Sequence, residues 1–297
     1  AGLLMLGGLL VMNGQMNIGQ FVAAEIIIIL VIASVEKLIQ TIESIYDVLT
    51  AIEKIGTVTD IPLENQEGYS FEPDELKDGV SIELKNLQFS LEDPPRKVLE
   101  KIDLKIAKAE KICLSGFNGS GKSMLLQLIA GLYTEYSGQI NVNGVPMANL
   151  DMDHLRAITG DSLSKEDIFR GTFMENISMG KPNITEKEVH QMVEMVGLTD
   201  FVNALKKGYQ NPMRPEGRTL PKSIIYKIKL ARALVGSPRI VLMEDIITQL
   251  ERDDMERIVN YLTDPELKTT VIVVTNNAQM AKRFDRILVL NNGEMLE

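Results

Sequence analysis

Gly116-Phe-Asn-Gly-Ser-Gly-Lys-Ser123 is the stretch that decides the fold of this chain, because it has the pattern G-x-x-x-x-G-K-[ST]. That pattern is typical of a loop whose backbone amides cradle the phosphates of a nucleotide. An apolar run at 111–115 precedes the loop and predicts a strand, and an apolar run at 124–130 follows it and predicts a helix. A strand before the loop and a helix after it form the context in which this motif binds phosphate.

The residue types in this loop suit an anion. Glycines at 116, 119 and 121 let backbone N–H groups turn inward, and the following helix N-terminus adds partial positive charge. Lys122 is expected to reach the β- and γ-phosphates, and the Ser123 hydroxyl to bind Mg²⁺. The candidate nucleotide-binding residues are Gly116, Asn118, Gly119, Ser120, Gly121, Lys122, Ser123 and Met124.

Length and composition limit the classes of protein. A chain of 297 residues suggests more than one structural unit, and a net charge of −10 argues against a nucleic-acid partner. The single cysteine, Cys113, cannot form an internal disulfide and is expected to be a small buried residue. The chain begins with Ala and ends in a predicted strand at 293–297, which suggests a piece of a longer protein.

The first part of the chain has the composition of a membrane segment. Residues 1–12 are nearly all apolar, and a polar turn at 13–20 separates them from an apolar run over 21–35. With its flanks this second run reaches about 20 residues, enough to cross about 30 Å of hydrocarbon. Lys37 is the first basic residue, so the turn is expected outside and the chain after Lys37 in the cytoplasm.

We therefore predict the end of one transmembrane helix, an external turn and a complete second helix in the lipid bilayer of the cell membrane. The alternative is a buried core helix of a soluble protein. Glu25 is costly at membrane depth unless it faces a bundle interior or the interface. An apolar stripe predicts that the helix continues as a stalk to residue 56, and the polar, proline-containing stretch 57–79 predicts a linker.

From Val80 onward the spacing of apolar residues is typical of a soluble domain. The alternation of apolar residues slips near Asn86, which predicts a β-bulge. Two continuous apolar runs late in the chain predict central parallel strands covered on both faces. Strands are expected at 80–91, 102–106, 139–144, 240–243 and 270–275, and helices at 186–197, 222–236 and 251–262.

A membrane hairpin, a stalk, a linker and a phosphate-loop domain, in that order, resemble the C-terminal part of an ABC transporter of the exporter type. Further family landmarks are Leu155-Arg156, Ile168–Thr172, Glu175–Ile177, Glu216-Gly217, Leu230–Leu234 and Pro238–Met243. The resemblance covers essentially the whole chain. It implies an α/β P-loop NTPase domain with a mixed central sheet over 80–297, a helical subdomain at about 162–238, and a membrane part over 1–56.

Aligned in this way, the chain departs from the family at the segment that completes the ATP site. The family's signature Leu-Ser-Gly-Gly-Gln falls on Leu220-Pro-Lys-Ser-Ile224. In the family this segment caps the γ-phosphate of ATP held by the opposite subunit. Pro221 removes one N–H donor, and Lys222 could meet a phosphate only as a point charge.

The resemblance also assigns catalytic positions. The family's Asp-Glu pair falls on Glu244-Asp245 in swapped order, so Glu244 is expected to serve Mg²⁺ with Ser123. Asp245 would position the attacking water but is one methylene shorter than the family's glutamate, and a displacement of about 1 Å can cost about a hundredfold in rate. The family's switch histidine falls on Asn276, which carries no titratable proton, and its metal-contacting glutamine falls on Ser164. The candidate catalytic residues are Asp245, Asn276 and Ser164.

The aromatic residue that stacks on adenine in the family falls near Leu91, with Phe89 close by, and the sequence leaves open which of them faces the base. The expected cofactors are ATP and Mg²⁺. The expected partner is a second half-transporter, identical or different.

The resemblance therefore predicts an ATP-binding exporter subunit whose hydrolysis is weak or depends on its partner. The alternatives are a fully active ATPase exporter with compensating substitutions and a nucleotide-gated membrane scaffold without transport.

Overall fold

The computed structural model describes residues 2–61, 64, 68–91, 93–163, 168–217 and 220–296. The chain divides into two compact units, residues 1–64 and 65–297.

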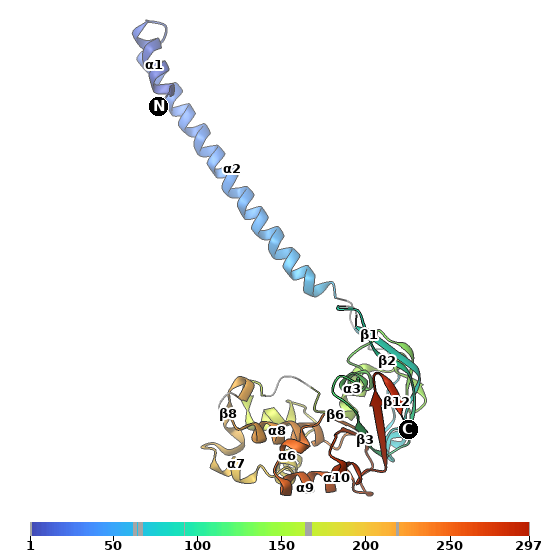
Figure 1. Ribbon diagram of the computed structural model, residues 1–297. Coiled ribbons are helices and arrows are strands. Elements are labelled where there is room, and N and C mark those ends of the chain that lie inside the picture. Colours follow the sequence, from blue (N-terminus) through green and yellow to red (C-terminus); the bar gives the residue numbers. More distant parts are fainter. Residues whose placement is uncertain are drawn as a thin grey trace. The chain divides into compact units, whose positions relative to one another are not determined.

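The first unit is a helical hairpin (Figure 1). It consists of α1 (Gly2–Met12) and α2 (Ile18–Thr59). The Asn17 side chain accepts a hydrogen bond from the Gln20 amide at 2.8 Å, and the Gln20 side chain accepts one from the Asn17 amide at 3.0 Å. This reciprocal cap satisfies two N–H groups and starts α2 inside the stretch expected to be a turn. In the described chain α2 alone is long and apolar enough to cross a membrane, and none of its apolar window is buried.

The second unit contains two main sheets. The order of the four-stranded antiparallel sheet is β2 (Arg96–Ile106), β1 (Ile82–Leu91), β4 (Ser137–Val142) and β5 (Val145–Pro146). The order of the six-stranded sheet is β12 (Glu294–Leu296), β11 (Arg286–Asn291), β3 (Lys111–Ser115), β10 (Thr270–Val274), β9 (Ile240–Met243) and β6 (Thr159–Asp161). Within the six-stranded sheet only β12 runs antiparallel to its neighbour, so the expected mixed sheet is confirmed for the described strands.

Helices surround these sheets. The longer ones are α3 (Lys122–Ile129), α4 (Met152–Ile158), α6 (Glu186–Met195), α8 (Lys222–Leu234) and α9 (Arg252–Leu262). The shorter ones are α5 (Phe173–Ser178), α7 (Thr199–Ala204) and α10 (Ala278–Ala281). Short 3₁₀ turns lie at Pro73–Leu76, Met147–Asn149, Gly208–Gln210, Pro215–Gly217 and Ile247–Gln249, and a small ribbon pairs β7 (Gly171–Thr172) with β8 (Pro212–Met213).

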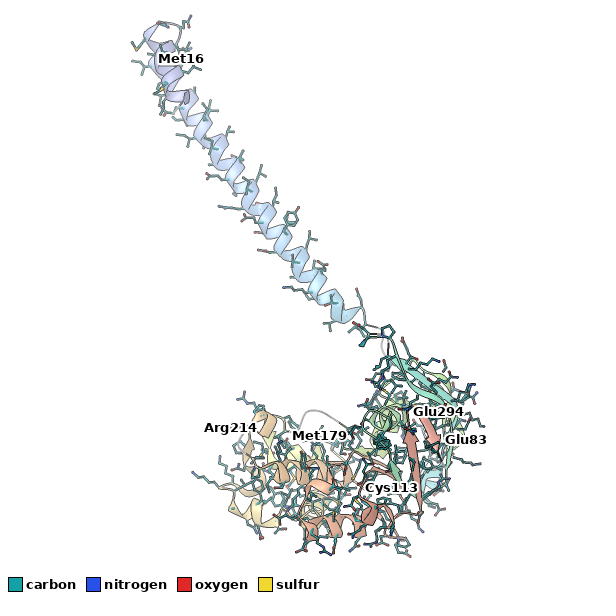
Figure 2. The ribbon with its side chains drawn as sticks, viewed as in Figure 1. Met16, Glu83, Cys113, Met179, Arg214 and Glu294 are labelled. Atoms are coloured by element: carbon teal, nitrogen blue, oxygen red, sulfur yellow. The ribbon has the colours of Figure 1, made fainter. Side chains whose placement is uncertain are left out.

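The parallel strands are buried on both faces, as their continuous apolar runs predict. Alternate residues enter two different cores. Cys113, Val241, Met243, Val271 and Val273 join the core that includes α6 and α8. Ile112, Leu114, Leu242, Ile272 and Val274 join the core that includes α3 and the antiparallel sheet. Figure 2 marks Cys113, which is fully buried, as expected of the cysteine before the glycine-rich loop.

The predicted β-bulge in the antiparallel sheet is confirmed. The pairing register of β1 with β2 shifts between Leu84 and Leu87, and Asn86 between them has φ +49°. The Asn143-Gly144 turn joins β4 to β5, with φ values of +47° and +82° that suit a tight hairpin.

The packed part of the second unit begins earlier than Val80, because part of the stretch 57–79 expected to be a linker belongs to the core. Phe71 and Leu76 are buried, and Tyr69 forms a parallel bridge with Leu150. At the other end of the stretch, α2 continues to Thr59. The prolines and charges of this segment predicted a linker, whereas its two apolar side chains hold it to the domain.

Candidate functional site

The glycine-rich loop 116–123 joins β3 to α3, and two of its glycines leave no room for a side chain. Gly116 has φ +144°, and a Cβ there would lie 2.1 Å from the Leu290 carbonyl oxygen. Gly121 caps α3 with φ +106°, and a Cβ there would lie 2.9 Å from the Val98 carbonyl oxygen. Only glycine combines these left-handed conformations with such close backbone approach, so the loop holds its amide groups in one shape.

Gly119 differs from these two glycines. Its φ is +80°, yet the nearest atom to a Cβ there would be Arg96 Nη2 at 3.9 Å. Its surroundings are therefore open, and its conformation alone favours glycine.

The side chain of Lys122 lies within the loop. Its Nζ donates hydrogen bonds to the carbonyl oxygens of Gly116 and Phe117, both at 2.8 Å, and lies 3.4 Å from Ser120 Oγ. Burial lowers the pKa of Lys122, and the negative charge of Asp245 opposes that shift. The loop thus holds a cation that an anion entering from solvent would meet.

The other residues expected to contact nucleotide share this loop and the first turn of α3. Ser120 is buried, whereas the side chains of Asn118 and Ser123 are exposed and Met124 is partly buried. The Ser120 carbonyl oxygen accepts a hydrogen bond from the Gly293 amide at 3.0 Å, which ties the loop to the turn between β11 and β12.

The carboxylates of Glu244 and Asp245 follow β9, and both side chains are partly buried. Asp245 Oδ1 accepts a hydrogen bond from Thr248 Oγ1 at 2.6 Å, and the Glu244 amide donates to Ser162 Oγ at 3.2 Å. Burial raises the pKa of Cys113 to about 11, and the charge of Asp245 adds to this shift. The strand end therefore places the Asp245 charge near both Lys122 and the strand that leads into the loop.

Asn276 follows β10 and contacts the start of the glycine-rich loop. Its Oδ1 accepts hydrogen bonds from Ser115 Oγ at 3.0 Å and from the Gly116 amide at 3.2 Å. The structure thus brings Asn276 into hydrogen-bond contact with the loop and the charge of Asp245 near Lys122. The remaining catalytic candidate, Ser164, lies outside the described residues.

Arg96 is a residue at this site that sequence reasoning missed. It lies at the start of β2, and its Nη2 donates a hydrogen bond to the Gly119 carbonyl oxygen at 3.3 Å. The two residues are 23 positions apart, and the contact depends on how the β1–β2 hairpin packs against the loop. The loop Gly116–Ser123 therefore has a second cation beside it.

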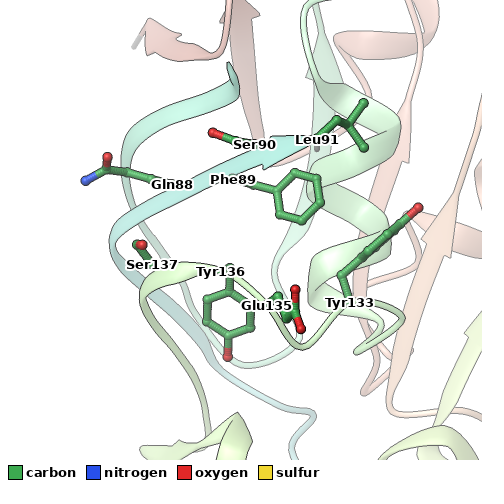
Figure 3. A pocket seen from close by; sticks show the side chains of 8 residues that line it. All are labelled: Gln88, Phe89, Ser90, Leu91, Tyr133, Glu135, Tyr136 and Ser137. Carbon is green, nitrogen blue, oxygen red and sulfur yellow. The ribbon is translucent and has the colours of Figure 1, made fainter. Parts of the chain in front are cut away.

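Phe89 and Leu91, the positions near which the adenine-stacking residue was expected, line the same cavity of about 590 Å³ (Figure 3). The Phe89 ring is 6% exposed and contacts the Tyr133 ring edge-on, with centroids 5.2 Å apart. Tyr133 follows the C-terminal end of α3, whereas the glycine-rich loop precedes its N-terminal end, about 12 Å away along eight helical residues. The Phe89 ring therefore packs against Tyr133 near the end of α3 that is remote from the loop.

The segment Leu220–Ile224 contains the start of α8, which begins at Lys222 as expected. Pro221 is the N-cap residue, has no N–H group, and makes no side-chain capping bond. Its carbonyl oxygen accepts from the amides of Ile224 and Ile225, at 3.1 and 3.2 Å. Both Pro221 and Lys222 are exposed, so this helix start presents a lysine side chain to solvent.

Comparison with known proteins gives matches to one family and to related chains. The profile of a family described as "ABC transporter" matches residues 99–248. The alpha-hemolysin translocation ATP-binding protein HlyB of Escherichia coli O157:H7 is 29% identical over 294 residues, which are 99% of this chain and 41% of that protein. The leukotoxin translocation ATP-binding protein LktB of Mannheimia glucosida matches with the same identity and coverage.

A solved structure shares the fold. The structure of a bacterial Atm1-family ABC exporter with ATP bound superimposes with a TM-score of 0.75 at 22% identity, covering 84% of this chain and 43% of that one. The present chain spans 41% of the length of the two curated relatives.

Proposed function

This chain belongs to the ABC transporter family, and from that premise we propose that it binds MgATP at the loop 116–123 as the nucleotide-binding part of a membrane exporter. The observation that carries the proposal is the loop itself. Gly116 and Gly121 fix its backbone where a side chain would collide, and the Lys122 ammonium lies inside it. Backbone amides, a helix N-terminus and a lysine together form the usual cradle for a polyphosphate.

The residues near the loop also suit Mg²⁺. This ion prefers oxygen ligands, keeps several waters, and is held by one or two protein groups together with substrate phosphates. The exposed hydroxyl of Ser123 and the carboxylate of Glu244 are oxygen donors of that kind. Among the described residues no cluster of three His, Cys, Asp or Glu side chains could hold a metal alone, which fits an ion that arrives with the nucleotide. When bound, Mg²⁺ would neutralise phosphate charge.

We propose that hydrolysis at this site is weak or depends on a partner, because the groups that would align the attacking water are altered. Asp245 is a short carboxylate, and one of its oxygens already accepts a hydrogen bond from Thr248. Asn276 cannot take up a proton, and its carbonyl oxygen is bonded to Ser115 and to the loop. Phosphoryl transfer depends on positioning and charge, so these changes would lower the rate more than the affinity.

The proposed partner is a second half-transporter whose α8 counterpart would complete the site. In this chain the corresponding segment offers the Lys222 ammonium, whereas Pro221 offers no N–H group. A lysine attracts phosphate as a flexible point charge and does not reproduce a fixed set of backbone donors. The geometry of that helix start thus supports the proposal that this chain's segment 220–224 caps the partner's ATP less well than the family's signature segment does.

The proposed location is a cell membrane, with the nucleotide-binding domain in the cytoplasm. It is supported by α2, whose apolar part is long enough to span a bilayer, and by curated relatives named for translocation. Lys37, the first basic residue of the chain, supports a cytoplasmic position for the part of α2 that follows it. Closure of two nucleotide-binding domains would then act on the membrane helices through this stalk.

The test measures equilibrium binding of a fluorescent ATP analogue and steady-state ATP turnover on the same purified protein with Mg²⁺. We expect binding, with turnover far below about 10 per second, the median for enzymes. Lys122→Ala should weaken binding about 100-fold, since hydrogen bonds to charged groups contribute about 1.5–3 kcal/mol each. Exposed Lys282 gives the matched control, and Lys282→Ala should leave binding unchanged.

Two results would contradict different parts of the proposal. A folded protein that takes up no nucleotide would overturn the ATP-binding assignment. Turnover near 10 per second in the absence of a partner would overturn weak hydrolysis and support the fully active ATPase.

A further inference from the structure

An ion pair with little exposure to solvent joins α8 to α9. Lys227 Nζ on α8 lies 2.5 Å from Asp254 Oδ2 on α9, and the two side chains are 13% and 10% exposed. Arg257, which follows on α9, places its Nη2 3.2 Å from the other carboxylate oxygen of Asp254. Each oxygen of this carboxylate therefore has a cationic partner, one from α8 and one from α9.

The same charged groups contact the turn that follows α6. The Lys227 ammonium donates a hydrogen bond to the Gly197 carbonyl oxygen at 3.1 Å. Gly197 has φ +72°, and a Cβ there would lie 2.6 Å from Asp254 Oδ1 and 2.7 Å from Arg257 Nη1. A side chain at this turn would displace the charged groups, so glycine lets the end of α6 approach them. The three helices α6, α8 and α9 (Figure 1) are thus joined through one group of charges.

This group of charges lies close to the start of α8. Lys227 is five residues beyond Lys222, where α8 begins, or about 7.5 Å along the helix axis. Pro221 at the N-cap makes no side-chain hydrogen bond. Counted from this end of α8, whose residues the structure all describes, Lys227 is the first whose side chain makes a polar contact. The ion pair is therefore the polar contact that holds the start of α8 to the rest of the unit.

On α9 the ion pair lies near the strand end that carries the acidic candidates. Asp254 belongs to the first turn of α9. The short 3₁₀ turn Ile247–Gln249 connects this helix to β9, and Thr248 in that turn donates a hydrogen bond to Asp245 Oδ1 at 2.6 Å. A short segment therefore links Asp245 to the residue that pairs with α8.

A buried ion pair contributes to placement in a way that apolar packing does not. Replacing such a pair by apolar side chains of similar volume is often neutral for stability, whereas removing one partner leaves the other charge buried and unpaired. Two apolar side chains tolerate several relative placements. The carboxylate of Asp254 and the ammonium of Lys227, each with a further polar partner, satisfy all these contacts in one placement.

We propose that Asp254 is a positioning residue, which through Lys227 holds the start of α8 at a fixed place relative to β9. The inference rests on the proposed function, because the placement of this helix start affects turnover only if it faces a nucleotide held by a partner. A displacement of about 1 Å at such a group can cost about a hundredfold in rate. Asp254 thus acts on turnover through α8, without touching nucleotide.

The test measures the position of the start of α8 by electron spin resonance distances in the full chain, between labels on Lys222→Cys and Lys282→Cys. Both positions are exposed, and the chain's own cysteine, Cys113, is buried. Labelled protein is diluted into unlabelled protein, so that only distances within one chain contribute. Lys227→Met combined with Asp254→Leu replaces the ion pair by apolar side chains. This apolar-pair variant should keep its denaturant midpoint and widen the distance distribution about twofold or more.

An exposed ion pair on the same helix gives the matched control. Arg252 Nε and Glu256 Oε1 on α9 lie 3.0 Å apart, with side chains that are 84% and 53% exposed. Exposed pairs contribute little, so Arg252→Gln combined with Glu256→Gln should leave the distance distribution unchanged. Asp254→Asn keeps the shape of the side chain without its charge and should widen the distribution even if the apolar-pair variant fails to fold. Lys227→Arg keeps a cation beside Asp254 and should keep the distribution narrow.

ATP binding and turnover are measured on the same variants. Loss of the ion pair should lower steady-state turnover about tenfold and change ATP affinity less than about twofold, because the loop 116–123 is untouched. A distribution as narrow as that of the wild type in both Asp254 variants refutes the positioning role, and so does equal widening in the exposed-pair control. A wild-type chain that binds no ATP overturns the proposed function instead. The distances need no nucleotide, so the two failures are distinguishable.

Discussion

Two helices of the second unit, α3 and α8, begin in opposite ways. Gly121 precedes α3 with φ +106°, and the carbonyl oxygens of Gly116 and Phe117 in the loop before it accept hydrogen bonds from the Lys122 ammonium. Pro221 precedes α8, lacks an N–H group, and is followed by an exposed lysine. One helix start thus follows a loop whose backbone shape is fixed by glycines, whereas the other presents an exposed lysine.

The start of α3 belongs to the part of the site that binds nucleotide. The start of α8 belongs to the part that would complete the nucleotide site of the opposite subunit. Fixed amides recognise phosphate through their geometry, and phosphate binding by them changes little unless the glycines of the loop are substituted. A lysine on a flexible stem attracts phosphate without orienting it. We infer that affinity for nucleotide depends on the start of α3, whereas the rate of hydrolysis is limited by Asp245 and Asn276 beside the loop together with the start of α8 supplied by the opposite subunit.

The largest effect on nucleotide affinity is expected for Gly116→Ala. The new Cβ would lie 2.1 Å from a backbone oxygen, at a residue with φ +144°, so the loop must shift. We expect nucleotide affinity to fall about 100-fold or more, the scale of losing two or more charge-assisted hydrogen bonds. Binding of a fluorescent ATP analogue measures the effect.

The matched control is Gly144→Ala, in the turn between β4 and β5. Gly144 also has a positive φ, of +82°, but a Cβ there would meet no atom within 4 Å. This variant should lose some stability through backbone strain and keep its affinity for ATP. An equal loss of affinity in both variants would show that global destabilisation, and not the loop, controls binding.

The next test makes the start of α8 resemble that of α3 in offering backbone donors. A variant combining Pro221→Ser, Lys222→Gly, Ser223→Gly and Ile224→Gln should increase steady-state turnover about tenfold, as expected for restored transition-state donors. Affinity for ATP should change far less than turnover. Asp245→Glu alone is the comparison variant, since it lengthens the carboxylate and leaves α8 untouched. Unchanged turnover in the combined variant would show that α8 does not limit the rate.

A smaller effect is expected at Arg96, which supports the loop from β2. Arg96→Ala removes the hydrogen bond to the Gly119 carbonyl oxygen and should weaken ATP binding about fivefold, near 1 kcal/mol. Lys97→Ala, at the exposed neighbouring position, is the control for loss of positive charge. If both variants lose affinity equally, general electrostatic attraction accounts for the effect.

A separate effect, which acts on stability and not on affinity, is a pH dependence that arises from the strand before the loop. The pKa of Cys113 is raised from 9.0 to about 11, so the thiol stays protonated in the folded state while the unfolded chain ionises. Its stabilising contribution is complete below about pH 9 and decreases as pH rises toward 11. The denaturant midpoint of the wild type should therefore fall more over this interval than that of Cys113→Ala. Parallel curves for the two proteins would contradict the prediction.

Features that depend on neighbouring residues could be predicted from the sequence. The glycine-rich loop, the bulge at Asn86 and the doubly covered strand β10 follow from local motif and periodicity. Asn276 was named as a candidate because of the resemblance, whereas its hydrogen bond to Ser115, 161 residues away, could not be predicted from neighbouring residues.

Other features depend on packing that periodicity does not encode. Arg96 meets Gly119 through the folding of a hairpin onto the loop, and Phe71 is buried by contacts of a segment whose composition suggested a linker. The β1–β2 register shifts again between Phe89 and Ser90, so simple alternation could not decide which side chain of β1 would face a base.

The length of α2 has a mechanical consequence. Its 42 residues form one helix from Ile18 to Thr59, about 63 Å long. The helix contains no proline, the commonest cause of a sharp kink. Because the helix is this long, a tilt of about 1° about one end would displace the other end by about 1 Å. A small rotation at the Thr59 end would therefore be transmitted along α2 as the displacement of a nearly straight rod.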